Sequence, residues 1–494
     1  MTCKITAAML YDFVRCPHRV GMDLFADPSK RDKVSAFAQL LWDRGHAYEK
    51  EVIQGLQIPF TDLSGLSNEA KRVATQEAMA RGDELIYQGR ITVDDLLGEP
   101  DLLRHQNNGY VAGDIKSGAG LEGVSDDSDG KPKKHYAAQL SLYTDILERR
   151  GEGANRQAFV WDIHGQEVIY DLEAPVGSRS SGSPWDYYRQ VLQDVRNVAS
   201  GAAQTRPVMA SECKLCHWRS VCKQQVKQSG DLTLIPELGR SKRDVLAPKI
   251  PTIKAMAKVD VTSFIRDKKT IFPRIGVTTL EKFQTRAKLL TDPNARPLVT
   301  ASIALPNAET ELFFDIETDP MRDLCYLHGF VQRNNGDNST EQFHAFLANE
   351  ATRAEEERAF TEAWAYVQSR QPCLIYYYSK YERTWWRKLR DRYPHVATEQ
   401  EIEAMFDPFV CIDLYGDVIH GHIEWPTNDY SIKTLAKYLG FDWRDTEPSG
   451  AASIEWYHTW VESGDPQIRQ RILDYNEDDC VAMRVLLDGI RKLT

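Results

Sequence analysis

The chain has 494 residues, more than one hydrophobic core usually organises, so about two to four domains are expected. Hydrophobic residues make up 42% and charged residues 27%, and no apolar run reaches the roughly 18 residues of a membrane helix. The N-terminus has no stretch resembling a signal peptide. We therefore expect a cytoplasmic protein with no membrane partner, whose nine cysteines are thiols or metal ligands and not disulfides.

The net charge of −11 is unevenly distributed along the chain. Residues 227–296 hold 15 Lys and Arg against 7 Asp and Glu, a local charge of +8. An acidic protein with one basic segment fits an enzyme whose carboxylates bind metal ions while a separate module meets phosphates. A solvated helical linker is the alternative interpretation of that segment.

Residues 1–226 are predicted to form a mixed α/β domain. The turn Asn107-Asn108-Gly109 indicates a β-hairpin, because Asn and Gly accept positive φ. The expected elements are helices at 36–56 and 137–149, strands at 101–105 and 109–116, and loops at 117–134 and 177–184.

Charged side chains gather at this hairpin. Gly98-Glu99-Pro100-Asp101 begins its first strand and Asp114-Ile115-Lys116 ends its second. Because residues two apart on a strand share a face, Asp114 and Lys116 should point the same way. Two carboxylates can hold a divalent metal ion, while the lysine steadies an attacking water or the developing charge on phosphorus.

Two predicted helices add candidate side chains. Glu49 lies on the first of them, one turn after His46. Gln139 and Tyr143 lie four residues apart on the second and so share one face. Taken singly, a solvated glutamate and a core tyrosine are the plainer interpretations, but the order of all these residues indicates one site.

Four cysteines form a further group. Cys213, Cys216 and Cys222 have the spacing C-x2-C-x5-C, and Cys16 lies near the other end of the segment. Four thiolates fit either a [4Fe–4S] cluster or a structural zinc ion. Either group would join the two ends of the domain.

Together these motifs resemble a RecB-type nuclease of the PD-(D/E)xK superfamily, in the iron–sulfur subgroup with the AddB nuclease domain and the CRISPR adaptation exonucleases. The resemblance covers most of residues 1–226 and implies a restriction-endonuclease-like core with Mg²⁺ or Mn²⁺ at its active site. His46 is the alternative to Glu49, although the G-x3-E register favours Glu49. The implied roles are metal ligation by Glu49, Asp101 and Asp114, catalytic assistance by Lys116, Gln139 and Tyr143, and a [4Fe–4S] cluster on Cys16, Cys213, Cys216 and Cys222.

Residues 227–297 are predicted to form a linker of short helices. The turns Ile235-Pro236-Glu237-Leu238-Gly239 and Phe272-Pro273-Arg274-Ile275-Gly276 are similar, and they resemble helix-hairpin-helix modules. Such turns present N–H groups at a helix start to phosphates. A spacer between two enzymes is the alternative. Salt-sensitive attraction to nucleic acid is expected from Lys242, Arg243, Lys268, Lys269 and Arg274.

Residues 298–494 are again predicted to be α/β. The expected elements are strands at 312–316, 373–378 and 409–414, a helix at 350–369, and a final helix from about residue 469. Asp315 and Glu317 share one face of the first strand, and Tyr475 and Asp479 share one face of the last helix. With Glu382, these carboxylates could bind two metal ions roughly 4 Å apart, the arrangement for in-line phosphodiester hydrolysis.

This segment resembles a DEDD-type exonuclease of the RNase H-like fold, in its tyrosine-bearing variant. Asp315 and Glu317 match the first motif, while Tyr475, which would orient the attacking water, and Asp479 match the third. The second motif departs from the family, because Tyr378 stands where Asn is usual and Glu382 replaces Asp, with Asp413 as a substitute or supporter. We therefore expect this site to contribute less to DNA cleavage than the first.

The sequence thus predicts three parts, residues 1–226, 227–297 and 298–494. The predicted function is that of a metal-dependent nuclease, and an exonuclease is favoured over an endonuclease. Its expected substrate is mainly single-stranded DNA or frayed DNA ends, in repair, recombination or defence. One alternative is a catalytically quiet nucleic-acid-binding adaptor for a helicase or a defence complex. Another is an RNA-processing exonuclease that acts through the last part.

Overall fold

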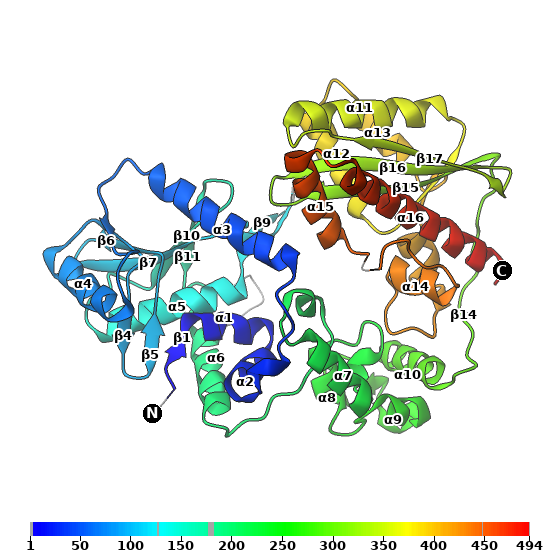
Figure 1. The fold of residues 1–494 in the computed structure, drawn as a ribbon. Helices are drawn as coiled ribbons and strands as arrows, with labels where there is room; N and C mark the ends of the chain where they lie inside the picture. The colour runs from blue at the N-terminus through cyan, green and yellow to red at the C-terminus, as the bar shows by residue number, and fades with distance from the viewer. Residues whose placement is uncertain (1–2, 126–127, 176–181, 447, 494) are drawn as a thin grey trace. The chain divides into compact units, whose positions relative to one another are not determined.

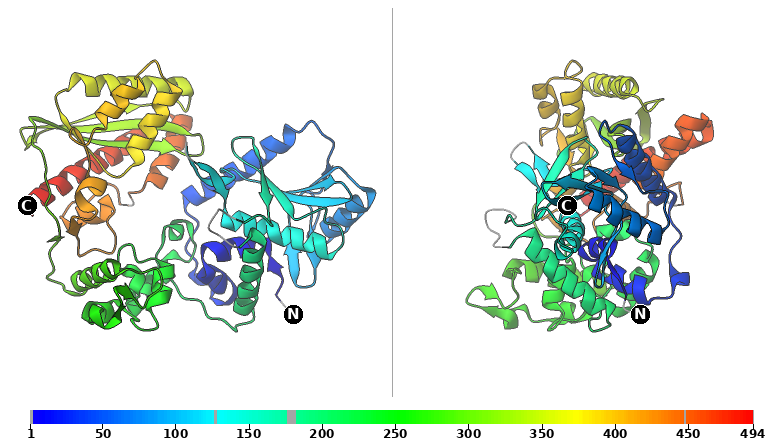
Figure 2. Two further views of the ribbon diagram at one scale, coloured as in Figure 1. Left: turned by 180° about the vertical axis from the view of Figure 1, so that it is seen from behind. Right: turned by 90° about the vertical axis from the view of Figure 1, so that its left-hand side faces the viewer.

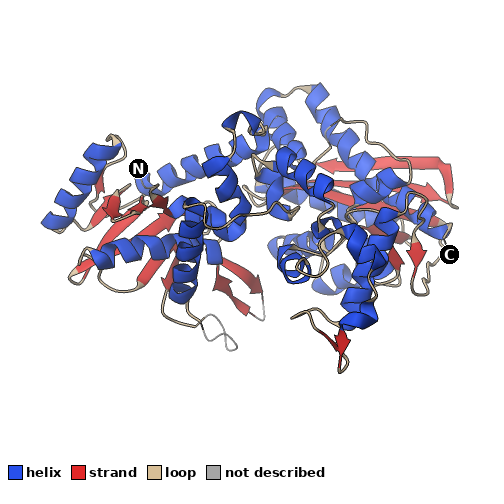
Figure 3. Cartoon of the chain, turned by 90° about the horizontal axis from the view of Figure 1, so that it is seen from below, coloured by secondary structure: helices blue, strands red, loops and turns tan. Residues whose placement is uncertain are grey.

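The computed structural model describes residues 3–125, 128–175, 182–446 and 448–493. The chain divides into two compact units, Met1–Lys223 and Gln224–Thr494. Each unit combines sheets with helices (Figures 1 and 3), so the expected mixed α/β, multidomain fold is confirmed. Among the described residues, no helix is long and apolar enough to cross a membrane.

The first unit is built on a six-stranded sheet with the order β11-β10-β7-β6-β3-β2, beside a small sheet β1-β5-β4 and a hairpin of β8 and β9. Its helices are α1 Ala7–Arg15, α2 Pro17–Phe25, α3 Ala36–Gln54, α4 Asn68–Arg81, α5 Lys134–Arg149 and α6 Pro184–Ala199, and α7 Arg219–Ser229 spans the boundary between the two units. Its strands are β1 Ile5–Thr6, β2 Thr61–Asp62, β3 Leu85–Tyr87, β4 Ile91–Val93, β5 Leu96–Gly98, β6 Leu102–Gln106, β7 Gly109–Ile115, β8 Leu121–Ser125, β9 Ser128–Pro132, β10 Gln157–Trp161 and β11 Glu167–Asp171.

Alternate residues of β7 face opposite sides of this sheet. Tyr110 and Ala112 belong to the core that α5 covers. Val111 and Ile115 belong to the core that includes Ile53 of α3. In Figure 1 these two helices accordingly lie on opposite faces of the first sheet. The alternation places Asp114 on the α5 side, at the end of the strand.

Most of the predicted elements of this unit are present, with one correction. Asn107 has φ 54°, as the hairpin turn between β6 and β7 requires. The loop predicted at 117–134 is wrong, because β8 and β9 pair there as an antiparallel hairpin. Polar side chains do not prevent a two-stranded ladder whose backbone groups pair with each other. Of the loop predicted at 177–184, residues 177–181 lie outside the described residues, and α6 begins at Pro184.

The second unit is built on a five-stranded sheet with the order β17-β16-β15-β18-β19, in which β18 runs parallel to β15 and to β19. Its helices are α8 Arg240–Leu246, α9 Ile253–Lys258, α10 Val277–Thr291, α11 Arg353–Ser369, α12 Tyr381–Arg392, α13 Glu399–Met405, α14 Ile432–Tyr438, α15 Gly450–Ser463 and α16 Pro466–Arg491. Its strands are β12 Ile265–Arg266, β13 Lys269–Thr270, β14 Leu298–Val299, β15 Thr310–Asp319, β16 Leu324–Asn334, β17 Asp337–Leu347, β18 Leu374–Tyr377, β19 Cys411–Asp413 and β20 Ile423–Glu424.

Helices cover both faces of this sheet, as Figure 1 and the reverse view in Figure 2 show. Phe314 packs on Trp386 of α12, in a core shared with α11. Phe313 belongs to the opposite core, with Met483 of α16. Because Asp315 and Glu317 alternate with the residues that face α11 and α12, they face α16.

The helices α8, α9 and α10 have a core of their own and are tied to β20, which pairs with β14 in a separate two-stranded sheet. Arg286 of α10 is 1% exposed and donates to Glu424 of β20, 2.5 Å away. The same guanidinium donates to the carbonyl of Pro236 at 2.7 Å. Tyr430 donates its hydroxyl to Glu424 at 2.6 Å. A buried cation with this many partners fixes the helical segment against β20.

Candidate active sites

Asp101, Asp114 and Lys116 meet at one end of the β6–β7 pair. Asp114 is 1% exposed, and its Oδ2 lies 2.9 Å from Lys116 Nζ. The N–H of Ile115 donates to Asp101 Oδ2 at 2.9 Å, and the N–H of Asp101 reaches Asp114 Oδ1 at 3.4 Å. Backbone hydrogen bonds therefore hold the two carboxyl groups side by side, with one lysine beside them.

The two carboxyl groups of Asp101 and Asp114 could accommodate a cation in addition to Lys116. Burial, and after it the charge of Asp114, raises the pKa of Asp101 to about 8. Burial acts to lower the pKa of Lys116, but the charges of Asp114 and Asp101 outweigh it and raise that pKa. Two buried carboxylates with only one lysine are under-compensated, so a divalent cation would stabilise their ionised forms.

Glu49 is half-buried and His46 is exposed on the same helix, and the carboxyl oxygens of Glu49, Asp101 and Asp114 do not all lie within 4.8 Å of one another. Glu49 Oε1 accepts hydrogen bonds from the Tyr87 hydroxyl at 2.8 Å and from Gln88 Nε2 at 2.9 Å. The charge of Glu49 is also one of the causes that raise the pKa of Asp101. The geometry thus favours Glu49 over His46 as the helical member of the site.

Gln139 and Tyr143 of α5 brace the turn that carries Asp101. Gln139 Nε2 donates to the Tyr143 hydroxyl at 3.1 Å, and that hydroxyl donates to the carbonyl of Glu99 at 3.2 Å. A Cβ on Gly98 would lie 2.7 Å from the Tyr143 ring, so only glycine lets the ring approach. Tyr143 therefore contacts the turn itself, and burial raises its pKa and keeps it a donor.

The four cysteines are neighbours in the structure, although no three of their sulfur atoms lie within 4.8 Å of one another. Cys16 lies between α1 and α2, Cys213 and Cys216 lie in and after a 3-10 turn, and Cys222 lies in α7. Burial raises the pKa of Cys222 to about 12, and the neighbouring Cys216, Cys16 and Cys213 act in the same direction. None of the nine cysteines forms a disulfide. Four thiols from both ends of the unit are a donor set that fits a [4Fe–4S] cluster or zinc.

Hydrogen bonds join the two ends beside these thiols. Asp23 Oδ1 accepts from Trp218 Nε1 at 2.9 Å and lies 2.7 Å from His217 Nε2. Asp32 Oδ2 accepts from the N–H of Ser220 at 2.8 Å. The ends are therefore held near each other by protein contacts, which prearranges the thiols.

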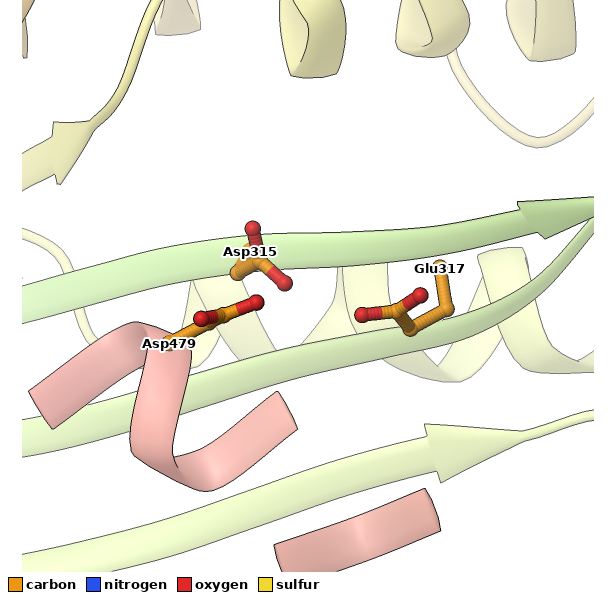
Figure 4. A group of neighbouring side chains, drawn as sticks. All are labelled: Asp315, Glu317 and Asp479. Carbon is orange, nitrogen blue, oxygen red and sulfur yellow. The ribbon is translucent and has the colours of Figure 1, made fainter. Parts of the chain in front are cut away.

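A second group of carboxyl groups lies in the second unit. Asp315 and Glu317 on β15 face Asp479 on α16, as Figure 4 shows. One oxygen of each lies within 4.8 Å of the others, and within the described ranges no other group of three such side chains meets this limit. Burial, followed by the charge of Asp479, raises the pKa of Glu317 to about 8 and that of Asp315 well above its usual range. These features fit a divalent cation.

The segment of the divergent second motif takes up a different arrangement. Glu382 is 3% exposed in the first turn of α12, and its charge adds to the raised pKa of Asp315, so it lies near the group of three without belonging to it. The Tyr378 hydroxyl donates to the carbonyl of Tyr430. Asp413 Oδ1 accepts the N–H of Ser379 at 2.7 Å, so Asp413 holds the chain just before α12.

Comparison with known families finds a nuclease superfamily in each unit. The family model of the PD-(D/E)XK nuclease superfamily matches residues 14–223, and that of the RNase_H superfamily matches residues 312–490. The chain carries a PD-(D/E)XK nuclease domain and an RNase H-like domain. No curated protein matches the chain significantly. Both superfamilies are nucleases that typically use divalent metal ions such as Mg²⁺ or Mn²⁺, so the two matches support a metal-dependent nuclease, a hydrolase that acts on nucleic acid.

Three side chains of the RNase H-like site escaped the sequence analysis. Asn476, fully buried, donates from Nδ2 to Asp315 Oδ2 at 2.7 Å. Lys433 Nζ donates to the Tyr475 hydroxyl at 2.5 Å, and Trp443 Nε1 donates to Asp479 Oδ1 at 2.7 Å. Asn476 directly follows Tyr475, and a polar residue on a buried helix face could have been predicted from the sequence as a further site residue. Lys433 and Trp443 lie on other elements, and no spacing points to them.

The basic segment needs one correction. Arg243 was expected to attract phosphates, but it is 3% exposed and pairs with Asp231 at 2.9 Å and with Asp244 at 2.6 Å. Lys242 donates to the carbonyl of Glu237 at 3.0 Å. By contrast, Lys268, Lys269 and Arg274 around the second turn are exposed. The two similar turns thus differ in the cations they offer to solvent.

Proposed function

We propose that the protein hydrolyses phosphodiester bonds of mainly single-stranded DNA, with Mg²⁺ or Mn²⁺, and that each of its two domains has a nuclease site. Exonucleolytic cleavage in DNA repair, recombination or defence in the cytoplasm is the role we favour. The observation that carries the proposal is that two separate groups of buried carboxyl groups lie beside a lysine, one in each nuclease domain.

In the PD-(D/E)XK domain, Glu49, Asp101 and Asp114 would hold the metal ion, which supplies an activated water and charge stabilisation at phosphorus. Lys116, only 2.9 Å from Asp114, would direct its remaining N–H groups to the water or to the phosphate. Gln139 and Tyr143 would keep Asp101 in place through the turn at Gly98.

In the RNase H-like domain, Asp315, Glu317 and Asp479 would hold a metal ion, with Glu382 as a further ligand on the α12 side. Tyr475 would donate its hydroxyl toward the attacking water. Asn476 supports the proposal, because its amide fixes one oxygen of Asp315 and leaves the other for a cation. These roles make the domain a second catalytic site, in preference to a quiet binding module.

The cysteine group would hold a [4Fe–4S] cluster as a structural element of the first domain. Its support is the donor set of four mutually interacting thiols from the two ends of the domain. The group of ligands lies apart from Asp101 and Asp114 in the sequence, and we give the cluster no part in hydrolysis.

The helical segment would act as a helix-hairpin-helix module that grips the phosphate backbone through its second turn. Glu237 and Arg274, at equivalent places in the two turns, both have positive φ, 63° and 62°, which supports a shared turn geometry. In the first turn, however, the carbonyl of Pro236 is engaged by Arg286. Only the second turn combines that geometry with exposed cations.

Cleavage of end-labelled single- and double-stranded DNA and RNA tests this proposal. The full chain is incubated with each substrate in Mg²⁺, in Mn²⁺ and in a chelator, beside the double variant Asp114→Ala/Asp315→Ala. Metal-dependent shortening by the wild type and none by the double variant is the expected result. Equal cleavage by both proteins, or no cleavage of any substrate by the wild type, would refute it.

A further inference from the structure

Lys433 is the cation that enters the acidic site of the RNase H-like domain. It lies in α14, and its Nζ is 2.5 Å from the Tyr475 hydroxyl oxygen and 3.6 Å from Asp479 Oδ2. The ammonium group also stands over the Tyr475 ring, 4.5 Å from the ring centroid. One lysine thus contacts two of the α16 side chains at this site, Tyr475 and Asp479.

Trp443 completes the surroundings of this lysine. Its Nε1 donates to Asp479 Oδ1 at 2.7 Å, and its ring centroid lies 5.7 Å from Lys433 Nζ. Asp479 therefore has one oxygen occupied by the indole, and its other oxygen faces the lysine. The Lys433 side chain remains 31% exposed, so the site stays open to solvent on this side.

The hydrogen-bond chemistry of this contact is directional. An ammonium group only donates, whereas a phenol has one hydrogen to give and lone pairs to accept with. When Lys433 donates to the Tyr475 oxygen, the hydroxyl hydrogen must point to another acceptor. Asp479 is that acceptor, because it is hydrogen-bonded to Tyr475 and belongs to the group of three carboxyl groups, so the hydroxyl hydrogen points to this group in the metal-free structure.

The same lysine limits the negative charge of the site. The ammonium group of Lys433 lies 3.6 Å from Asp479 Oδ2, and one oxygen of Asp479 lies within 4.8 Å of an oxygen of Asp315 and of Glu317. Its contact with Asp479 places this charge where a bound metal ion would also lie. A cation at this distance repels the metal ion as well as attracting the carboxylate.

We propose that Lys433 is a positioning residue of this site: it fixes the direction in which Tyr475 donates and offsets one carboxylate charge at Asp479. The inference rests on the proposed function of the RNase H-like domain. It predicts that removing Lys433 changes both the rate of hydrolysis and the affinity for the metal ion.

A double-mutant cycle tests the contact with Tyr475. The full chain carries Asp114→Asn, so that remaining cleavage comes from the second site, and single-stranded DNA and RNA are the substrates. Lys433→Ala and Tyr475→Phe should each slow cleavage at least about tenfold, and their combination should be no slower than the slower single variant. Effects that multiply would mean that Lys433 does not act through Tyr475, which would overturn the inference.

Manganese binding tests the contact with Asp479 without relying on cleavage. In the same Asp114→Asn protein, with free Mn²⁺ followed by electron paramagnetic resonance, Lys433→Ala should tighten binding at the second site at least about threefold. Lys433→Arg keeps the charge and should keep the original affinity. Lys437→Ala, one turn along α14 at a side chain 75% exposed, should change neither rate nor binding.

The two measurements separate the possible failures. Slower cleavage with tighter Mn²⁺ binding supports the inference, because a residue that merely holds the fold would weaken both when removed. If the Asp114→Asn protein cleaves neither substrate but Lys433→Ala tightens its Mn²⁺ binding, the proposed activity of the domain is refuted. The proposed effect of Lys433 on metal binding is then still supported. Unchanged or weaker binding in Lys433→Ala would overturn the inference whatever the rate.

Discussion

At the scale of single residues, buried carboxyl groups make the metal-free protein sensitive to pH. The pKa of Asp101 is raised from 3.8 to about 8 in the folded chain. A raised pKa favours the protonated form in the folded state, so this group's contribution to stability is fully present below about pH 4 and is lost as the pH rises through about 8. Metal ions would offset that loss.

The first prediction concerns Asp101→Asn, which removes this titration. In a chelator at pH 8, the variant should be more stable than the wild type by at least about 1 kcal/mol, since one pKa unit corresponds to about 1.4 kcal/mol. Urea unfolding at pH 5 and pH 8 measures this difference in the free energy of unfolding. Asp94 is exposed, so Asp94→Asn is the control. Equal stabilities of variant and wild type at pH 8 would contradict the account.

The second prediction concerns Gly329 on β16. A Cβ there would lie 1.7 Å from Asn476 Oδ1, so Gly329→Ala must displace the amide that holds Asp315. Overpacking of this kind typically costs about 1–3 kcal/mol. Thermal unfolding should show this loss together with weaker Mn²⁺ binding. Gly450→Ala, where a Cβ would meet nothing within 4 Å, should show neither change.

At the scale of elements, the cysteines join the start of the first domain to its end. The third prediction is that anaerobically purified protein is brown and absorbs broadly near about 400 nm, as iron–sulfur proteins do. Because metal binding is coupled to folding, Cys16→Ala should lose both iron and stability, whereas exposed Cys3→Ala should lose neither. A colourless protein with stoichiometric zinc and no iron would contradict the cluster and indicate a zinc site on the same cysteines.

The second turn of the helical segment gives the fourth prediction. Replacing Lys268, Lys269 and Arg274 by Ala should weaken DNA binding alike for all sequences. The slope of log affinity against log salt should flatten by about 0.7 to 0.9 for each phosphate that the protein no longer neutralises. Lys249→Ala/Lys254→Ala, also exposed but away from the turn, is the control. An unchanged slope in the triple variant would indicate that the segment is a spacer and does not bind phosphates.

Residues that lie close together in the sequence were predictable as partners, and distant ones were not. Local spacing is sufficient for Asp114 with Lys116 and for Tyr475 with Asp479, because strand and helix geometry alone brings such pairs together. Lys433 lies 42 residues from Tyr475, so only the tertiary fold brings these two side chains into contact.

Errors at the scale of elements have physical reasons as well. The basic neighbours of Arg243 predict an exposed cation, but Asp231, twelve residues earlier, pairs with it in the core. The polar composition of the β8–β9 hairpin predicts a loop, while ladder hydrogen bonds depend on the backbone. Charge and composition describe a segment without showing where its partners lie.

At the scale of the whole molecule, the chain combines a PD-(D/E)XK domain with an RNase H-like domain, and we propose a separate metal site for each. The family matches alone do not divide the activity between the two domains. The divergent second motif, with buried Glu382 outside the group of three carboxyl groups, leads us to expect the smaller share of DNA cleavage from the RNase H-like site.

The most direct test compares two isosteric variants of the full chain on end-labelled single-stranded DNA with Mn²⁺. Asp114→Asn keeps the shape of the side chain and removes the charge that holds the cation, so it should slow cleavage at least about 10²-fold. Asp315→Asn should slow it less, and the double variant should be inactive. If Asp114→Asn cleaves at the wild-type rate while Asp315→Asn is inactive, the main chemistry belongs to the RNase H-like domain and the account is contradicted.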